Sequence, residues 1–169
     1  AAGILILACL LLVFPAAAAI LVYDGNSTAG SLQGMINAAN ASDTILVKGG
    51  TYTENLVIDR PLTLRALDSN NPPNLVVSRG GTGINLTAKG ITIDGVILTG
   101  NGHCGILVQS DNNEITNVSI SGFDEGVRLK SAVNNEVAAS RLVNNTIGIT
   151  LDQESQVNTF YLNYMDNPT

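Results

Sequence analysis

Five charged residues between positions 124 and 152 are the side chains of this sequence best suited to catalysis. They comprise two adjacent carboxylates, two basic residues on one face of an expected strand, and a further carboxylate: Asp124, Glu125, Arg128, Lys130 and Asp152. Hydrolysis of a glycosidic bond needs two carboxyl groups roughly 5 to 9.5 Å apart, which neighbouring repeats of a stacked fold can supply. Charged residues at a surface are more often simply solvated, so these five are weak catalytic candidates.

The sequence offers few ligands for a soft metal ion. Its one histidine, His103, precedes Cys104, and its two methionines are Met35 and Met165. A soft-metal site needs several His, Met or Cys side chains that converge. A turn histidine beside a core cysteine is the more common arrangement, so we predict no metal site.

A repeat of 21 or 22 residues must position these side chains. Each unit begins with a glycine and an apolar–polar alternation, which predicts a short strand with one buried face; the glycines are Gly83, Gly105, Gly126 and Gly148. An Asn- and Ser-rich turn follows, and then a second apolar run such as 115–120. Two or three short strands fit in each repeat and a helix does not. We therefore predict an all-β fold, a right-handed parallel β-helix with about 22 residues per coil; the Leu-rich pattern of leucine-rich repeats is absent.

Equivalent turn positions of successive repeats carry asparagines. These are Asn113, Asn135 and Asn158. Stacked coils lie about 4.8 Å apart, so inward-facing amides at these positions can hydrogen-bond along the axis as an asparagine ladder. We expect this ladder to be structural.

The chain divides into three parts. Residues 1–19 resemble a signal peptide, with a membrane anchor as the alternative because residues 4–22 lack a charge. Residues 20–41 are predicted to form a strand and then a short capping helix at 29–41, with Ser31 as the N-cap of the helix. Residues 42–169 are predicted to form the coils of the β-helix. The last coil has no cap, so we expect the protein to continue beyond residue 169.

The charge of the chain argues against nucleic acid as a binding partner. The net charge is −6 with a pI near 4.5, and the eight Lys and Arg residues are scattered, so no basic stripe exists for nucleic acid. Export would make five Asn-x-Ser/Thr triplets candidate glycosylation sites: Asn26, Asn40, Asn85, Asn117 and Asn144.

Four segments of the first coil resemble a known family. They are SLQ at 31–33, SDTILV at 42–47, GTYTEN at 50–55 and RPLTL at 60–64. They are similar to the start of NosD-like right-handed β-helix domains, exported surface proteins of archaea and bacteria in the pectin-lyase-like superfamily. The resemblance implies the β-helix fold, but not one activity, because the superfamily holds lyases, hydrolases, epimerases and passive surface modules. Its name-giving members are periplasmic accessories of copper-enzyme maturation, a role that the few soft ligands do not favour.

These observations favour a non-enzymatic exported module, at the cell surface or secreted, or periplasmic in a Gram-negative bacterium. The expected partner is a polysaccharide or cell-surface glycan bound on a lateral face, and a membrane is expected only through the N-terminal segment or a C-terminal anchor beyond residue 169. The alternatives are a polysaccharide lyase, hydrolase or epimerase, and a NosD-like copper accessory. We expect no cofactor; Ca²⁺ would be needed only by the lyase.

Overall fold

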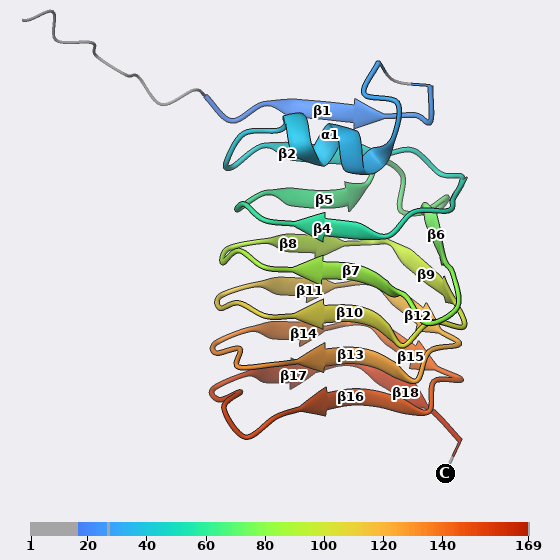
Figure 1. Cartoon of the computed structure of the whole chain (residues 1–169), viewed down its shortest axis with the longest axis vertical. Helices are drawn as coiled ribbons and strands as arrows, with labels where there is room; N and C mark the ends of the chain where they lie inside the picture. The colour runs from blue at the N-terminus through green and yellow to red at the C-terminus, as the bar shows by residue number, and fades with distance from the viewer. Residues whose placement is uncertain (1–16, 27, 169) are drawn as a thin grey trace, which may run out of the picture.

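The chain forms a stack of coils in which short parallel strands line up into three sheets (Figure 1). The computed structural model describes residues 17–26 and 28–168. The predicted all-β parallel β-helix, with coils of about 22 residues and a short capping helix, is confirmed. Most of the predicted signal peptide lies outside the described residues.

The three sheets run along the axis of the stack. The seven-stranded sheet contains β1 (Ile20–Tyr23), β2 (Thr44–Val47), β5 (Thr63–Ala66), β8 (Thr92–Asp94), β11 (Glu114–Thr116), β14 (Glu136–Ala138) and β17 (Thr159–Tyr161). The five-stranded sheet contains β4 (Leu56–Ile58), β7 (Thr82–Leu86), β10 (Cys104–Val108), β13 (Glu125–Leu129) and β16 (Ile147–Leu151). The six-stranded sheet contains β3 (Thr51–Tyr52), β6 (Asn74–Val77), β9 (Ile97–Gly100), β12 (Ser119–Ser121), β15 (Arg141–Val143) and β18 (Tyr164–Asp166).

The repeat glycines form a column where the coils approach most closely. A Cβ atom at Gly83, Gly105 or Gly126 would lie 2.6 Å from the carbonyl oxygen of the glycine on the next coil. No side chain fits at that distance, so the column requires glycine. Beside it, Ile84, Ile106 and Val127 lie in register and are fully buried, which places the core between the sheets.

The second apolar run of each repeat forms two strands separated by a sharp corner. The corner residue has a positive φ of 54° at Asn117, 48° at Ala139 and 54° at Leu162. Asparagine tolerates this left-handed backbone, whereas alanine and leucine adopt it only where the surrounding coils impose it. The corner therefore turns the chain from the seven-stranded to the six-stranded sheet within one run.

The ladder asparagines are hydrogen-bonded from coil to coil. Asn113 Nδ2 donates to Asn135 Oδ1 at 2.9 Å, and Asn135 Nδ2 donates to Asn158 Oδ1 at 3.1 Å. The same oxygens accept the backbone N–H of the preceding asparagine at 2.8 Å. Asn113 and Asn135 are buried, so these bonds satisfy polar groups that water does not reach.

The N-terminal end is covered by β1 and by α1 (Leu32–Ala38). Ser31 is the N-cap and accepts the N–H of Gly34 at 2.9 Å. Glu54 reaches the same end from the first coil, and its two carboxylate oxygens accept the N–H groups of Leu32 and Gln33 at 3.0 Å. A carboxylate is favourable there because the first N–H groups of a helix lack partners within the helix. The helix is shorter than the predicted 29–41.

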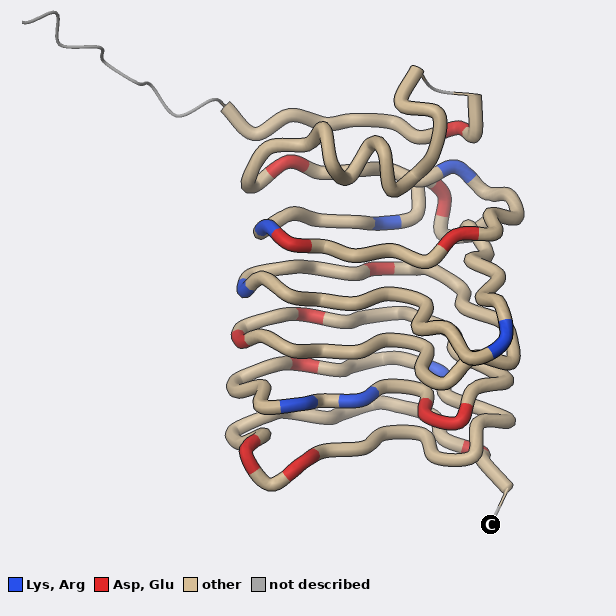
Figure 2. The backbone as a smooth tube through the Cα atoms, in the orientation of Figure 1, with Lys and Arg blue, Asp and Glu red and all other residues tan. Residues whose placement is uncertain are grey.

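Acidic and basic residues both occur along the stack of coils (Figure 2). Asp94, Glu114 and Glu136 lie on the seven-stranded sheet together with Arg65, and Glu125, Arg128 and Lys130 lie along or just after β13 of the five-stranded sheet. No helix among the described residues is long and apolar enough to cross a membrane. Of the glycosylation candidates, Asn85 is partly buried on β7 and the other four are exposed: Asn26, Asn40, Asn117 and Asn144.

Candidate functional site

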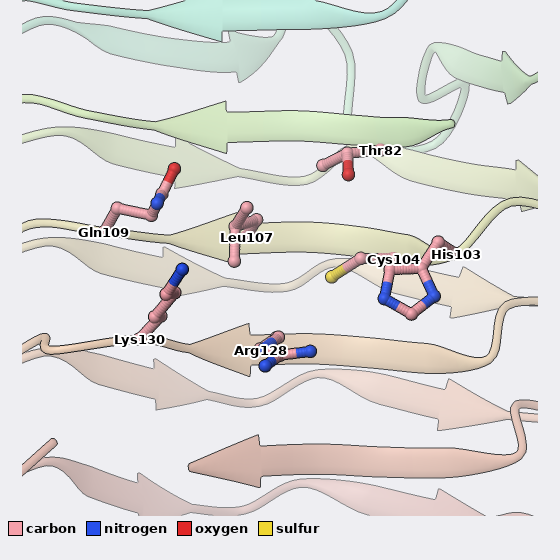
Figure 3. A pocket seen from close by; sticks show the side chains of 7 residues that line it. All are labelled: Thr82, His103, Cys104, Leu107, Gln109, Arg128 and Lys130. Atoms are coloured by element: carbon pink, nitrogen blue, oxygen red, sulfur yellow. The ribbon is translucent and has the colours of Figure 1, made fainter. Parts of the chain in front are cut away.

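The outer face of the five-stranded sheet carries a shallow pocket of about 230 Å³ between neighbouring coils. We call it the β10–β13 pocket; its lining residues are Thr82, His103, Cys104, Leu107, Gln109, Arg128 and Lys130. Figure 3 shows Leu107 and Gln109 above Arg128 and Lys130. This alignment follows from strand register, in which Leu107 pairs with Arg128, and from the alternation that points every second side chain outward.

A chain of polar contacts forms one end of the pocket. His103 Nδ1 lies 3.1 Å from Asp124 Oδ2, and His103 Nε2 lies 4.0 Å from Glu125 Oε2. Arg128 NH1 donates to the same Glu125 oxygen at 3.1 Å. Glu125 is 9% exposed, so it depends on the guanidinium to compensate for the water that it loses. The arrangement fixes the direction of the Arg128 side chain.

Cys104 forms part of the pocket wall but is 1% exposed. Its thiol donates to the carbonyl oxygen of Ile106 at 3.2 Å. Burial, together with the carboxylate of Glu125, raises the pKa of Cys104 to about 12. The side chain is therefore a neutral thiol at physiological pH and not a nucleophile.

Among the described residues, two buried side-chain oxygens in line with the pocket have no hydrogen-bond partner. They are Asn85 Oδ1 and Thr150 Oγ1. Asn85 pairs in register with Leu107, and Thr150 pairs with Arg128, so both belong to the outward row that passes through the pocket. Buried polar atoms normally have partners, so these two oxygens are exceptions on this sheet. The protein covers both oxygens, so a ligand on this face reaches them only if their side chains move.

The structure separates the five charged candidates into two groups. Asp124, Glu125 and Arg128 lie at one end of the pocket, and Lys130 lines it. Asp152 instead stabilises a turn: its oxygens accept the N–H of Ser131 at 2.9 and 3.1 Å and the hydroxyl of Ser155 at 2.7 Å. These contacts lower the pKa of Asp152, the Ser155 hydroxyl most strongly.

Sequence reasoning missed three residues that line the pocket: Thr82, Leu107 and Gln109. Alignment of the repeats on their glycines contains the signal. Thr82 and Cys104 each precede a repeat glycine, Leu107 and Arg128 follow one by two positions, and Gln109 and Lys130 follow one by four. Residues at equal offsets must lie side by side on neighbouring coils.

Comparison with protein families gives one match, which covers residues 17–169. The matching family is described as periplasmic copper-binding protein (NosD). The chain belongs to the NosD family. This membership indicates an exported β-helix protein. No curated protein and no solved structure shows a significant match to the chain.

The described residues do not fit the copper ion that the NosD description implies. His103 has carboxylates facing both ring nitrogens, and the Cys104 thiol is protonated and bonded to a backbone carbonyl. Met165 is far along the chain in the last coil, and Met35 belongs to α1. Nowhere in residues 17–26 and 28–168 do three His, Cys, Asp or Glu side chains converge as a metal site. Copper prefers several converging soft ligands, which this set does not provide.

Proposed function

We propose that this NosD-family chain is an exported module that binds carbohydrate on the five-stranded sheet and does not catalyse a reaction. The observation that carries the proposal is the β10–β13 pocket, where the polar side chains of Gln109 and Lys130 stand at matched positions just after β10 and β13, beside Thr82 of β7 and Arg128 of β13. Successive strands are about 4.8 Å apart, so the face presents hydrogen-bonding groups at regular intervals along the axis.

The chemistry of the pocket suits a sugar. Thr82 and Gln109 offer a hydroxyl and an amide, which donate and accept hydrogen bonds, and Leu107 gives an apolar surface for the C–H side of a ring. Pockets that orient a ligand commonly combine an apolar surface with a few placed polar groups.

The contacts of the acidic side chains favour binding over catalysis. Glu125 is paired with Arg128, Asp124 with His103, and Asp152 with its own turn. A glycosidase needs one carboxyl group to donate a proton and another to act as base or nucleophile at the same bond. The three carboxylates are instead engaged by neighbouring groups of the protein.

A single experiment tests binding and catalysis together. The full chain is incubated with a panel of neutral and uronate polysaccharides, with and without Ca²⁺, while binding is followed by calorimetry and turnover by new reducing ends and by the absorbance of unsaturated uronates. We expect binding without turnover, weakened by Gln109→Ala but not by Gln153→Ala, which removes an exposed glutamine. Turnover on any polymer would contradict the non-enzymatic role.

The family description supports a second candidate, an accessory role in copper handling. Copper titration in competition with a chromogenic chelator tests it. Binding of one ion per chain that is lost in His103→Ala would favour this candidate, whereas the ligand set described above leads us to expect weak, nonspecific binding.

A further inference from the structure

We infer that the carbohydrate bound at the β10–β13 pocket carries carboxylate groups, and that Arg128 and Lys130 hold one of them. The inference rests on the proposed function, because it names the chemical class of the ligand for the same site.

The pocket lining carries two basic side chains in a chain that is acidic as a whole. The net charge is −6, yet the permanently charged side chains that line the pocket are both basic. Arg128 and Lys130 lie two positions apart and therefore leave the sheet on the same side (Figure 3). A chain with this net charge repels an acidic polymer over most of its surface. Asp124 and Glu125 lie at one end of the pocket and face His103 and Arg128, so Lys130 and the remaining donors of Arg128 are the groups that can attract such a polymer.

Both basic groups have free hydrogen-bonding capacity. Among the described residues, no carboxylate forms an ion pair with Lys130. Arg128 has five N–H donors, and Glu125 accepts from one of its nitrogens, NH1. Asp152, one coil further, is held in its turn by Ser131 and Ser155. A guanidinium fixed by one carboxylate is well placed to hold a second with its remaining donors.

The size of the pocket limits what enters it. A volume of about 230 Å³ is below the roughly 300–1,000 Å³ of pockets that enclose a drug-sized ligand. One sugar ring fits, and the rest of a chain would lie on the open face. Asn85 and Thr150 lie in the row to either side, so adjoining sugars would pass over them. The geometry suits one uronate residue within a longer glycan.

The test compares an oligouronate with the same oligomer after its carboxyl groups have been reduced to hydroxymethyl groups. We expect calorimetry to show at least about tenfold tighter binding of the native oligomer, which is the size of effect that a charged hydrogen bond provides. High salt should remove most of the difference. Lys130→Gln and Arg128→Gln should each reduce the preference.

Two controls separate binding from folding and from net charge. Lys89→Gln and Arg79→Gln remove the same charges from exposed turns and should leave the preference intact. Because Arg128→Gln leaves Glu125 without its partner, the double change Glu125→Gln with Arg128→Gln is the matched variant that removes both charges and leaves no unpaired buried carboxylate. Equal affinity for native and reduced oligomers would overturn the inference and leave the proposed function standing. Failure of every glycan, neutral or acidic, to bind would overturn both.

Discussion

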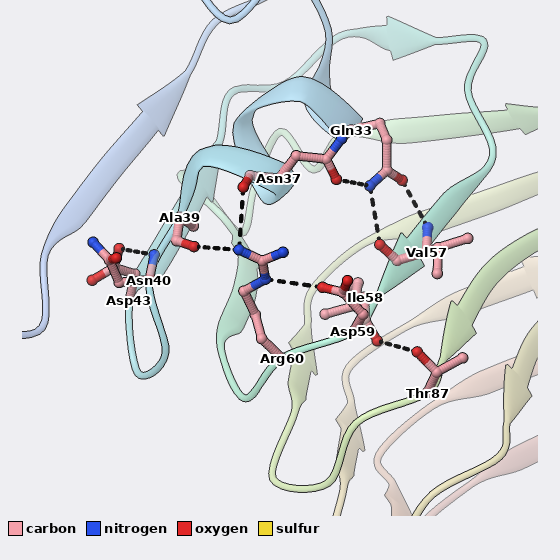
Figure 4. Close-up of polar contacts among 10 residues, drawn as sticks. All are labelled: Gln33, Asn37, Ala39, Asn40, Asp43, Val57, Ile58, Asp59, Arg60 and Thr87. Carbon is pink, nitrogen blue, oxygen red and sulfur yellow. Dashed lines mark hydrogen bonds and ion pairs between the residues drawn. The ribbon is translucent and has the colours of Figure 1, made fainter.

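The side chain of Gln33 pairs with the backbone of Val57 as a neighbouring strand would. Gln33 Oε1 accepts the Val57 N–H at 2.7 Å, and Gln33 Nε2 donates to the Val57 carbonyl at 3.0 Å (Figure 4). Val57 lies in β4, the edge strand of the five-stranded sheet. Arg60 anchors the other end of α1 by donating to the carbonyls of Asn37 and Ala39. The helix thereby blocks the sheet edge on which another chain could add a strand.

Gln33→Ala should expose this edge. Loss of the two hydrogen bonds is expected to cost about 1 kcal/mol, because water replaces part of what is lost at a partly exposed site. Hydrogen exchange of the Val57 amide should become faster, and the variant should aggregate more readily at high concentration. Gln153→Ala serves as the control. Unchanged protection of Val57 would mean that the pairing does not stabilise the edge.

Asn113→Val tests the ladder. The substitution leaves the buried N–H of Ile91 without its acceptor, because Asn113 Oδ1 accepts that N–H at 2.9 Å. It also removes one of the two donors to Asn135 Oδ1, which keeps the backbone N–H of residue 113. We expect the free energy of unfolding to fall by about 1–3 kcal/mol in urea denaturation. Asn101→Val, at an exposed bend, should have a smaller effect. An unchanged midpoint for Asn113→Val would show that the amides are hydrated.

Acid should destabilise the N-terminal end through Asp43. Backbone N–H groups of Ala19 and Asn40 donate to its carboxylate at 2.7 Å and lower its pKa. A carboxyl group with a lowered folded pKa contributes stability above its unfolded pKa of about 3.9 and loses it as the pH falls through the folded value. Thermal midpoints should therefore drop below about pH 4, and Asp43→Asn should be less stable at neutral pH with a flatter profile. Asp166→Asn controls for net charge; identical profiles for Asp43→Asn and the parent would contradict the assignment.

Cys104 should resist alkylation in the folded protein. With its pKa raised to about 12 by burial and by Glu125, almost no thiolate is present at pH 8. The sequence has one other cysteine, Cys9, which Cys9→Ser removes from the assay. In that background, iodoacetamide should label Cys104 of the native chain more than about a hundredfold more slowly than Cys104 of the urea-unfolded chain. Comparable rates would mean that the pocket opens to expose the thiol.

The repeat made the fold predictable from sequence, because side chains at equal offsets from Gly83, Gly105 and Gly126 must stack whatever their identity. The corners were harder to predict. Asn117 is a residue that tolerates positive φ, but Ala139 and Leu162 at the equivalent corners are not, and only the packing of neighbouring coils places them there.

The site was less predictable, because charge and spacing in a sequence do not specify contacts. Arg128 and Lys130 were predicted on one strand face and both line the pocket, but the contact between His103 of the preceding coil and Asp124 is a property of the folded turn. Asp152 is a carboxylate, as a catalytic residue would be, but its hydrogen bonds to Ser131 and Ser155 show that it stabilises a turn. The chain matches the NosD family, but its described residues do not provide the converging side chains that a copper ion needs.

Hydrogen–deuterium exchange of the chain with and without a bound oligouronate tests the central claim most directly. If the five-stranded face binds the glycan, protection should increase at and beside the pocket, in β7, β10 and β13, and remain unchanged on the seven-stranded sheet. Protection confined to the seven-stranded or six-stranded sheet, or no change under conditions where calorimetry shows binding, would contradict the account.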